Sequence, residues 1–130
     1  MMAQQLSETD NVAPPSAQRV TKSQSEPLLL DLVHLSCQTF GDAALEMEVL
    51  RLFLGQAEST SSALRCTSDG TERARLYHLI KGSARGVGAF ELSELAQAGE
   101  DDPASAKNLD ATLDGIERVM ARVDALLGTD

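Results

Sequence analysis

Residues 109–127 read LDATLDGIERVMARVDALL, and this stretch decides the fold class. Its apolar residues recur at alternating steps of four and three, namely Leu109, Leu113, Ile116, Met120, Val123 and Leu127. This spacing forms a single apolar stripe along an α-helix, and such a stripe is buried against other helices. The Asp102-Pro103 pair that precedes it predicts an N-cap and a first helical turn.

The same periodicity predicts three more helices upstream of this one. Asp42 is expected to cap a helix that runs to about Cys66, and the Ser68–Thr71 cluster predicts a turn after it. The next helix is predicted from about Glu72 until Gly86 and Gly88 end it. A further helix follows from Ala89 to about Ala98.

A shorter helix is expected before these four. Pro27 suits its first turn, Leu28, Leu32 and Leu35 recur at helical spacing, and Gly41 ends it. A flanking apolar stripe of the following helix, formed by Leu45, Val49 and Leu52, needs cover from this short helix or from a partner, and we expect the short helix to provide it. That cover predicts a monomer.

No segment shows the alternation of a half-buried strand. We therefore expect an all-α fold over residues 26–130, an antiparallel up-down four-helix bundle with the short N-terminal helix added to it. Residues 1–25 are rich in Gln, Ser, Thr and Pro without apolar periodicity, which predicts a flexible tail.

The composition excludes several classes of function. A net charge of −9 argues against a nucleic-acid binder and against docking on anionic lipid. The longest unbroken apolar runs are three residues, such as Leu28–Leu30, so neither a membrane span nor a signal peptide is predicted. Cys37 and Cys66 stand alone, which suggests neither a disulfide framework nor a metal site. We expect a cytoplasmic protein without a cofactor.

The helix predicted from about Glu72, the third of the five, carries the most informative residues, over positions 75–85 (RLYHLIKGSAR). At about 100° per residue, His78 faces away from the apolar side of the helix, and Lys81, Gly82 and Arg85 share its outward face. Glycine inside a helix costs about 1 kcal/mol relative to alanine, so Gly82 argues for close approach of another protein to the imidazole. The predicted buried side consists of Leu76, Leu79, Ile80 and Ser83.

Charge is distributed in support of this interpretation. Residues 71–90 hold four bases and one acid, whereas both flanking regions are acidic. A positive region around an exposed imidazole suits an anionic partner or an anion carried on the ring.

The motif His78-x-x-Lys81-Gly82-Ser83, with Gly88 ten positions after the histidine, resembles the signature of histidine-containing phosphotransfer (HPt) domains. Leu92, Leu95 and Glu100 also fall where that family commonly has two apolar positions followed by a polar or acidic one. The resemblance spans about Asp31 to Leu127 and is strongest over residues 76–100. Tyr77 departs from the small residue that often precedes the family's histidine.

The resemblance implies a phosphoryl carrier in a multistep two-component phosphorelay, not a self-standing enzyme. His78 would accept phosphate from the aspartate of one receiver domain and donate it to another, and a hybrid histidine kinase would supply the relay. Lys81 would balance phosphoryl charge, Gly82 would leave room for the receiver, and Gly88 would serve the helix end. Ser83 and Arg85 are further candidates for supporting the phosphoryl group and docking the partner.

Two alternatives belong to other classes. A non-catalytic helical adaptor would explain the helices and the Leu45/Val49/Leu52 stripe, but not the combination of His78, Lys81 and Gly82. A di-iron bundle needs two Glu-x-x-His motifs, and only Asp31-x-x-His34 comes near. His34 lacks a following Lys-Gly pair, so we expect a structural or merely exposed side chain there.

Overall fold

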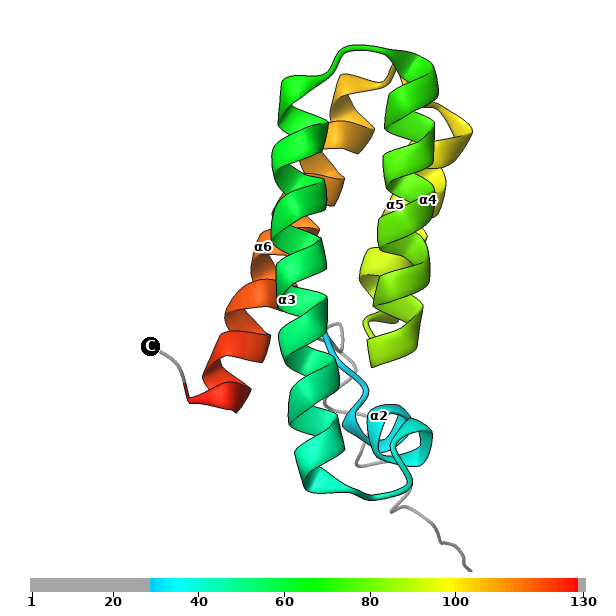
Figure 1. Cartoon of the computed structure of the whole chain (residues 1–130). Coiled ribbons are helices and arrows are strands. Elements are labelled where there is room, and N and C mark those ends of the chain that lie inside the picture. The colour runs from blue at the N-terminus through cyan, green and yellow to red at the C-terminus, as the bar shows by residue number, and fades with distance from the viewer. Residues whose placement is uncertain (1–28, 129–130) are drawn as a thin grey trace, which may run out of the picture.

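The computed structural model describes residues 29–128, which fold into five α-helices without a strand (Figure 1). The helices are α2 (Leu32–Gln38), α3 (Ala43–Cys66), α4 (Gly70–Val87), α5 (Phe90–Asp101) and α6 (Ala106–Leu127). This confirms the all-helical class for the described residues. The predicted tail over residues 1–25 lies outside them. Within 29–128, no helix combines the length and apolar character needed to cross a membrane.

Side-chain caps begin α3 and α4. The Asp42 carboxylate accepts the Leu45 N–H at 3.1 Å at the start of α3, and Asp69 accepts the Glu72 N–H at 2.9 Å at the start of α4. Each cap satisfies a backbone donor that the first helical turn leaves without an intrahelical partner. The predicted helix from the Asp42 cap to Cys66 is confirmed, and α4 begins two residues earlier than predicted.

Two predicted helix starts are wrong for the same reason, because a different side chain supplies the cap. Asp31 accepts the His34 N–H at 3.1 Å, so α2 begins at Leu32 and not near Pro27, which lies outside the described residues. Ser105 accepts the Asn108 N–H at 3.1 Å and begins α6. Asp102, predicted as that cap, instead ends α5.

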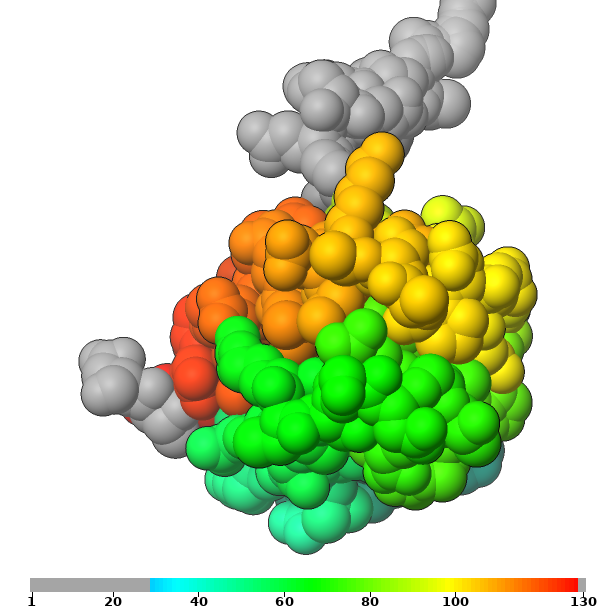
Figure 2. Space-filling model, turned by 90° about the horizontal axis from the view of Figure 1, so that it is seen from above, coloured from blue at the N-terminus to red at the C-terminus, as the bar shows by residue number. Residues whose placement is uncertain are grey.

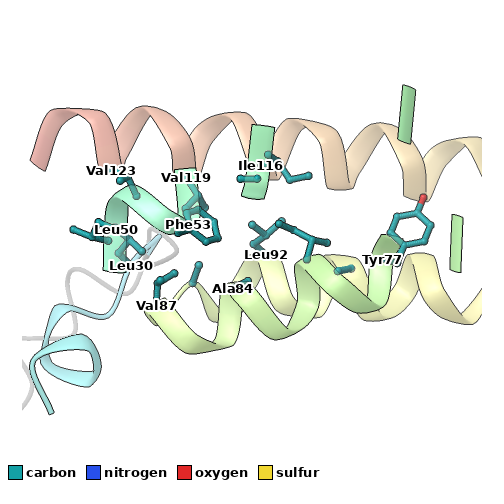
Figure 3. Close-up of a cluster of buried hydrophobic side chains, with 14 of the residues drawn as sticks. Leu30, Leu50, Phe53, Tyr77, Ala84, Val87, Leu92, Ile116, Val119 and Val123 are labelled. Carbon is teal, nitrogen blue, oxygen red and sulfur yellow. The ribbon is translucent and has the colours of Figure 1, made fainter. Parts of the chain in front are cut away.

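The four longer helices lie side by side around a common core (Figures 1 and 3). Contacts join α3 to α4, α4 to α5, α5 to α6 and α6 back to α3. Seen from above, green α3 and α4 occupy one side of the molecule and yellow to orange α5 and α6 the other (Figure 2). The core is aliphatic apart from two aromatic side chains, Phe53 and Tyr77. Its large aliphatic members include Leu35, Leu64, Ile80, Leu92, Ile116, Val119 and Val123.

The buried side of α4 differs from the prediction. Tyr77 is fully buried, whereas Leu79 is exposed and Ser83 lies half-buried at the α3 side. Tyr77 turns inward because Gly99 on α5 leaves room for its ring. The buried residues of α4 are Leu76, Tyr77, Ile80, Ala84 and Val87.

Gly88 joins the end of α4 to the segment that leads into α2. It caps α4 in the left-handed conformation, with φ of 84°, which a residue with a side chain rarely adopts. Its carbonyl accepts the Asp31 N–H at 2.9 Å, and a Cβ at this position would lie 2.7 Å from the Asp31 carbonyl oxygen. Both the conformation and the close approach therefore require glycine.

The short helix α2 covers less of α3 than predicted. It packs at one end of the molecule, against α4 and α3, and the His34 ring meets Phe90 edge-on with centroids 5.1 Å apart. Leu45 remains exposed and Leu52 is 65% exposed. The expected cover of the Leu45/Val49/Leu52 stripe by the first helix is thus wrong, because α2 is too short to extend along α3.

Candidate functional site

His78 lies in the middle of α4 and presents its ring to solvent. Its side chain is 66% exposed, although α4 itself packs against α3 and α5. One side of the ring faces polar groups of α5. An apolar groove between α3 and α4 lies further along α4, where its lining begins at Ser83.

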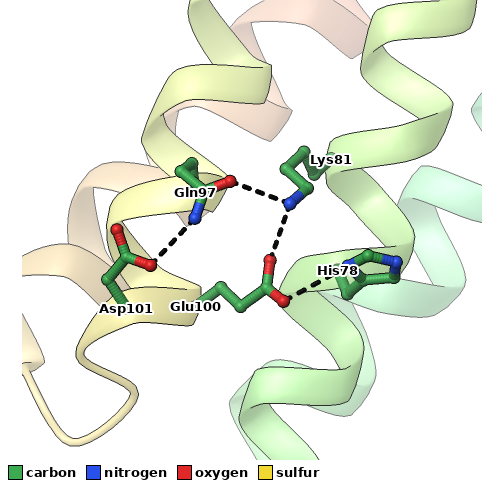
Figure 4. Close-up of polar contacts among 5 residues, drawn as sticks. All are labelled: His78, Lys81, Gln97, Glu100 and Asp101. Carbon is green, nitrogen blue, oxygen red and sulfur yellow. Dashed lines mark hydrogen bonds and ion pairs between the residues drawn. The ribbon is translucent and has the colours of Figure 1, made fainter.

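On the α5 side, the Glu100 carboxylate fixes the orientation of the imidazole. Nδ1 of His78 lies 3.2 Å from Oε2 of Glu100. The hydrogen bond from Lys81 lowers the pKa of Glu100, so this carboxyl is ionised near neutral pH and can only accept. Nδ1–H is therefore the donor, and in a neutral ring Nε2 carries the free electron pair. Figure 4 shows the second ring nitrogen turned away from Glu100.

Lys81 is held by two oxygens of α5. Its ammonium donates to Oε1 of Gln97 at 2.8 Å and to Oε1 of Glu100 at 2.9 Å (Figure 4). Gln97 in turn donates through its amide nitrogen to Asp101 at 2.8 Å. The Lys81 side chain is only 18% exposed, so the charge sits at a fixed position one helical turn from His78. These contacts form a continuous polar network that consists of His78, Lys81, Gln97, Glu100 and Asp101.

On the α3 side, missing side chains open the surface beside the imidazole. An added Cβ at Gly82 or Gly86 would meet nothing within 4 Å. Ser83 donates to Oε1 of Gln56 across the α3–α4 contact at 2.6 Å. Ser83 and Gln56 belong to the lining of a groove of about 200 Å³ between α3 and α4. The lining is mostly apolar and consists of Val49, Leu52, Phe53, Gln56, Ser83, Gly86 and Val87.

The positive region predicted around His78 is partly neutralised. Arg75 pairs with Glu72 at 2.6 Å and Lys81 pairs with Glu100. Arg73 donates to two backbone carbonyl oxygens, at Thr67 and Pro103. Arg85 is exposed and, within residues 29–128, has no charged or hydrogen-bonded partner. Acids from α4 and α5 thus pair with two of the four bases, so the local positive region is weaker than the sequence predicts.

Three of the sequence-predicted site residues share one side of α4, since Lys81 and Gly82 follow His78 at helical spacings of three and four residues. Gly88 lies apart, at the C-cap. Gln97 and Asp101 were not identified from the sequence, and their only signal was a polar i, i+4 pair on the helix that also carries Glu100. Within the described residues, no group of three or more His, Cys, Asp or Glu side chains could hold a metal ion.

Comparison with known proteins returned no relatives: no family model matches the chain, and neither a curated protein nor a solved structure matches it.

Proposed function

We propose that the protein is a phosphoryl carrier of a two-component phosphorelay, with His78 as the group that is phosphorylated. One observation carries the proposal: the His78 side chain is 66% exposed, and Glu100 occupies Nδ1 while Nε2 has no partner among the described residues. An imidazole held in this way is a nucleophile whose reacting atom faces solvent. The HPt-like motif found in the sequence agrees with this arrangement.

The chemistry needs little from this chain beyond positioning. Nε2 donates its electron pair to the phosphorus of an aspartyl phosphate, the bond from phosphorus to the aspartate oxygen breaks, and the aspartate leaves as a carboxylate. The Nδ1 proton stays on the ring, where the negative Glu100 carboxylate stabilises the positive charge that the phosphorylated ring acquires. The reverse transfer returns the electron pair to Nε2 and passes the phosphoryl group to a second aspartate.

Lys81 has a more limited part in the proposal than a free lysine would have. Its ammonium is bound to Gln97 and Glu100, so it supports the carboxylate that holds His78 and adds positive charge near the transferred group. Arg85 lies seven residues after His78 on the same face of α4 and is the cation available for a partner or for phosphoryl oxygens. Ser83 is engaged with Gln56 at the rim of the groove.

The proposed fold is the antiparallel up-down four-helix bundle, with α2 as an additional short helix. The ring of contacts from α3 through α4, α5 and α6 back to α3 supports it. Short connections between these helices also favour neighbours that run in opposite directions. In this bundle His78 sits midway along one helix, where a partner has access from the side.

We expect receiver domains to dock over His78 and the adjacent α3–α4 groove. Leu52 and Leu79 are exposed there, and Gly82 and Gly86 let a partner helix come close to the α4 backbone. An apolar, hollowed surface beside a nucleophile suits transient association with several partners. Such a carrier would act in the cytoplasm between a hybrid histidine kinase and a response regulator.

A non-catalytic helical adaptor remains the second candidate, because the groove and the exposed Leu52 would serve it equally well. Incubation with a panel of aspartyl-phosphorylated receiver domains separates the two. A carrier acquires a phosphate that is stable to base and labile to acid, and that maps to His78. A folded protein that stays unlabelled with every receiver, yet binds through the groove, would establish the adaptor instead.

A further inference from the structure

Directly beneath the candidate site, a buried contact joins α4 to α5. Tyr77 precedes His78 in the chain and is fully buried, and Gly99 precedes Glu100. A Cβ on Gly99 would lie 2.5 Å from Cζ and 2.7 Å from Cδ1 of Tyr77, which no real side chain allows. The tyrosine ring therefore rests on the bare backbone of α5.

This contact sets how the two helices lie against each other at the site. The ring fixes both the separation of α4 and α5 and their register, because it fits only where the side chain is missing. One residue further along each chain, His78 and Glu100 meet at 3.2 Å, and Glu100 also reaches Lys81 at 2.9 Å. A shift of α5 by about 1 Å would break hydrogen bonds of this length.

We infer that Tyr77 and Gly99 are positioning residues that hold Glu100 against Nδ1 of His78 and so select the ring nitrogen that reacts. Only the expected effect on phosphotransfer rests on the proposed function, since the orientation of the His78 ring can be measured independently. It also explains why a large residue is accepted where the HPt-like motif usually has a small one. The glycine that faces it on α5 compensates for the added volume.

The ring of Tyr77, and not its hydroxyl, performs this role. The hydroxyl oxygen is buried and has no hydrogen-bond partner among the described residues. Burial also raises the pKa of Tyr77, so the group stays neutral near physiological pH. Tyr77→Phe should therefore keep the ring orientation of His78, and removal of an unsatisfied buried hydroxyl should leave the melting temperature equal or higher.

The test is ¹⁵N NMR of the His78 ring in Gly99→Ala, combined with the rate of phosphotransfer. The added methyl group should force α5 away from Tyr77, so that the signals change from protonated Nδ1 toward protonated Nε2 and transfer slows about tenfold. Tyr77→Leu/Gly99→Ala should recover most of the wild-type signals, because leucine lacks the Cε1 and Cζ atoms. Gly55→Ala is the matched control, since nothing lies within 4 Å of an added Cβ there.

Val123→Ala is the control for a general loss of stability. It opens a cavity in the core at the opposite end from Tyr77 (Figure 3) and should leave the His78 ring signals unchanged. Wild-type ring signals in folded Gly99→Ala would overturn the inference. If Gly99→Ala does not fold, Tyr77→Leu decides: changed His78 signals support the role and unchanged signals refute it. If the wild-type protein never accepts phosphate, but the variants show these NMR changes, the proposed function is refuted and the positioning role of Tyr77 and Gly99 stands.

Discussion

The two histidines of the chain lie in regions that differ in every feature that makes an imidazole reactive. His34, on the short helix α2, is half-buried and packs edge-on against Phe90, and no hydrogen bond involves its ring within residues 29–128. His78, on α4, is exposed, has Nδ1 bound to Glu100, and is followed one turn later by Lys81 and Gly82. A histidine becomes a candidate for chemistry when one ring nitrogen is fixed and the other is left open.

The difference also reflects how each region is built. The His34 region is held by packing and by backbone contacts such as the Asp31 N–H to the Gly88 carbonyl. The His78 region is held by side chains that extend from α5 across to α4. Packing fixes where a ring lies, whereas hydrogen bonds also fix where its proton lies.

The largest effect is expected for the two histidines themselves. His78→Ala should abolish phosphorylation by aspartyl-phosphorylated receivers, because it removes the only exposed ring with a free nitrogen among the described residues. His34→Ala should retain wild-type labelling. Mass-spectrometric mapping under basic conditions checks both variants, with circular dichroism to show that they are folded. Label that persists in folded His78→Ala would contradict the assignment.

The next effect concerns access to the ring. Gly82→Leu should slow transfer on the order of a hundredfold, since a side chain beside the imidazole displaces a docking partner from the position for in-line attack. The fold should remain, because nothing lies within 4 Å of an added Cβ. Gly55→Leu makes the same change at an open helical glycine of α3 and should transfer normally. Equal rates for the two variants would show that Gly82 has no steric role.

Glu100→Gln should reduce transfer about tenfold at neutral pH, because an amide can donate as well as accept and no longer fixes the proton on Nδ1. The pKa of Glu100 is lowered by its bond to Lys81, so its ionised form favours the folded state above the ordinary value of 4.5. That contribution is lost as the pH falls through the lower, folded value. The melting-temperature difference between wild type and variant should be constant near neutral pH and vanish in acid.

The smallest effect is one of stability alone. Gly82→Ala should raise the free energy of unfolding by up to about 1 kcal/mol, because alanine has the higher helix propensity at an open position. Gly88→Ala should do the reverse, since its φ of 84° and the Asp31 backbone exclude a side chain. Thermal denaturation of the pair measures this contrast. Destabilisation of both would mean that Gly82 is a packing residue.

Sequence reasoning succeeded where the determining interactions are local. Helical periodicity and the Asp42 cap predicted α3 to its last residue, and the outward position of His78 followed from its angle on α4. The start of α6 was predicted wrongly because Asp102 and Ser105 are both good N-caps. Only the packing of the preceding helix decides between two such competitors.

What the amino-acid sequence determined by itself is the set of helices and the face of α4 on which His78 lies, because both depend on residues within a few turns of one another. Only the tertiary structure decided that Tyr77 is buried while Leu79 is exposed, and that Lys81 is bound to Gln97 and Glu100. Periodicity fixes the angle of each side chain about its own helix axis. It does not fix the register between two helices, which is set by where a large ring meets a bare glycine.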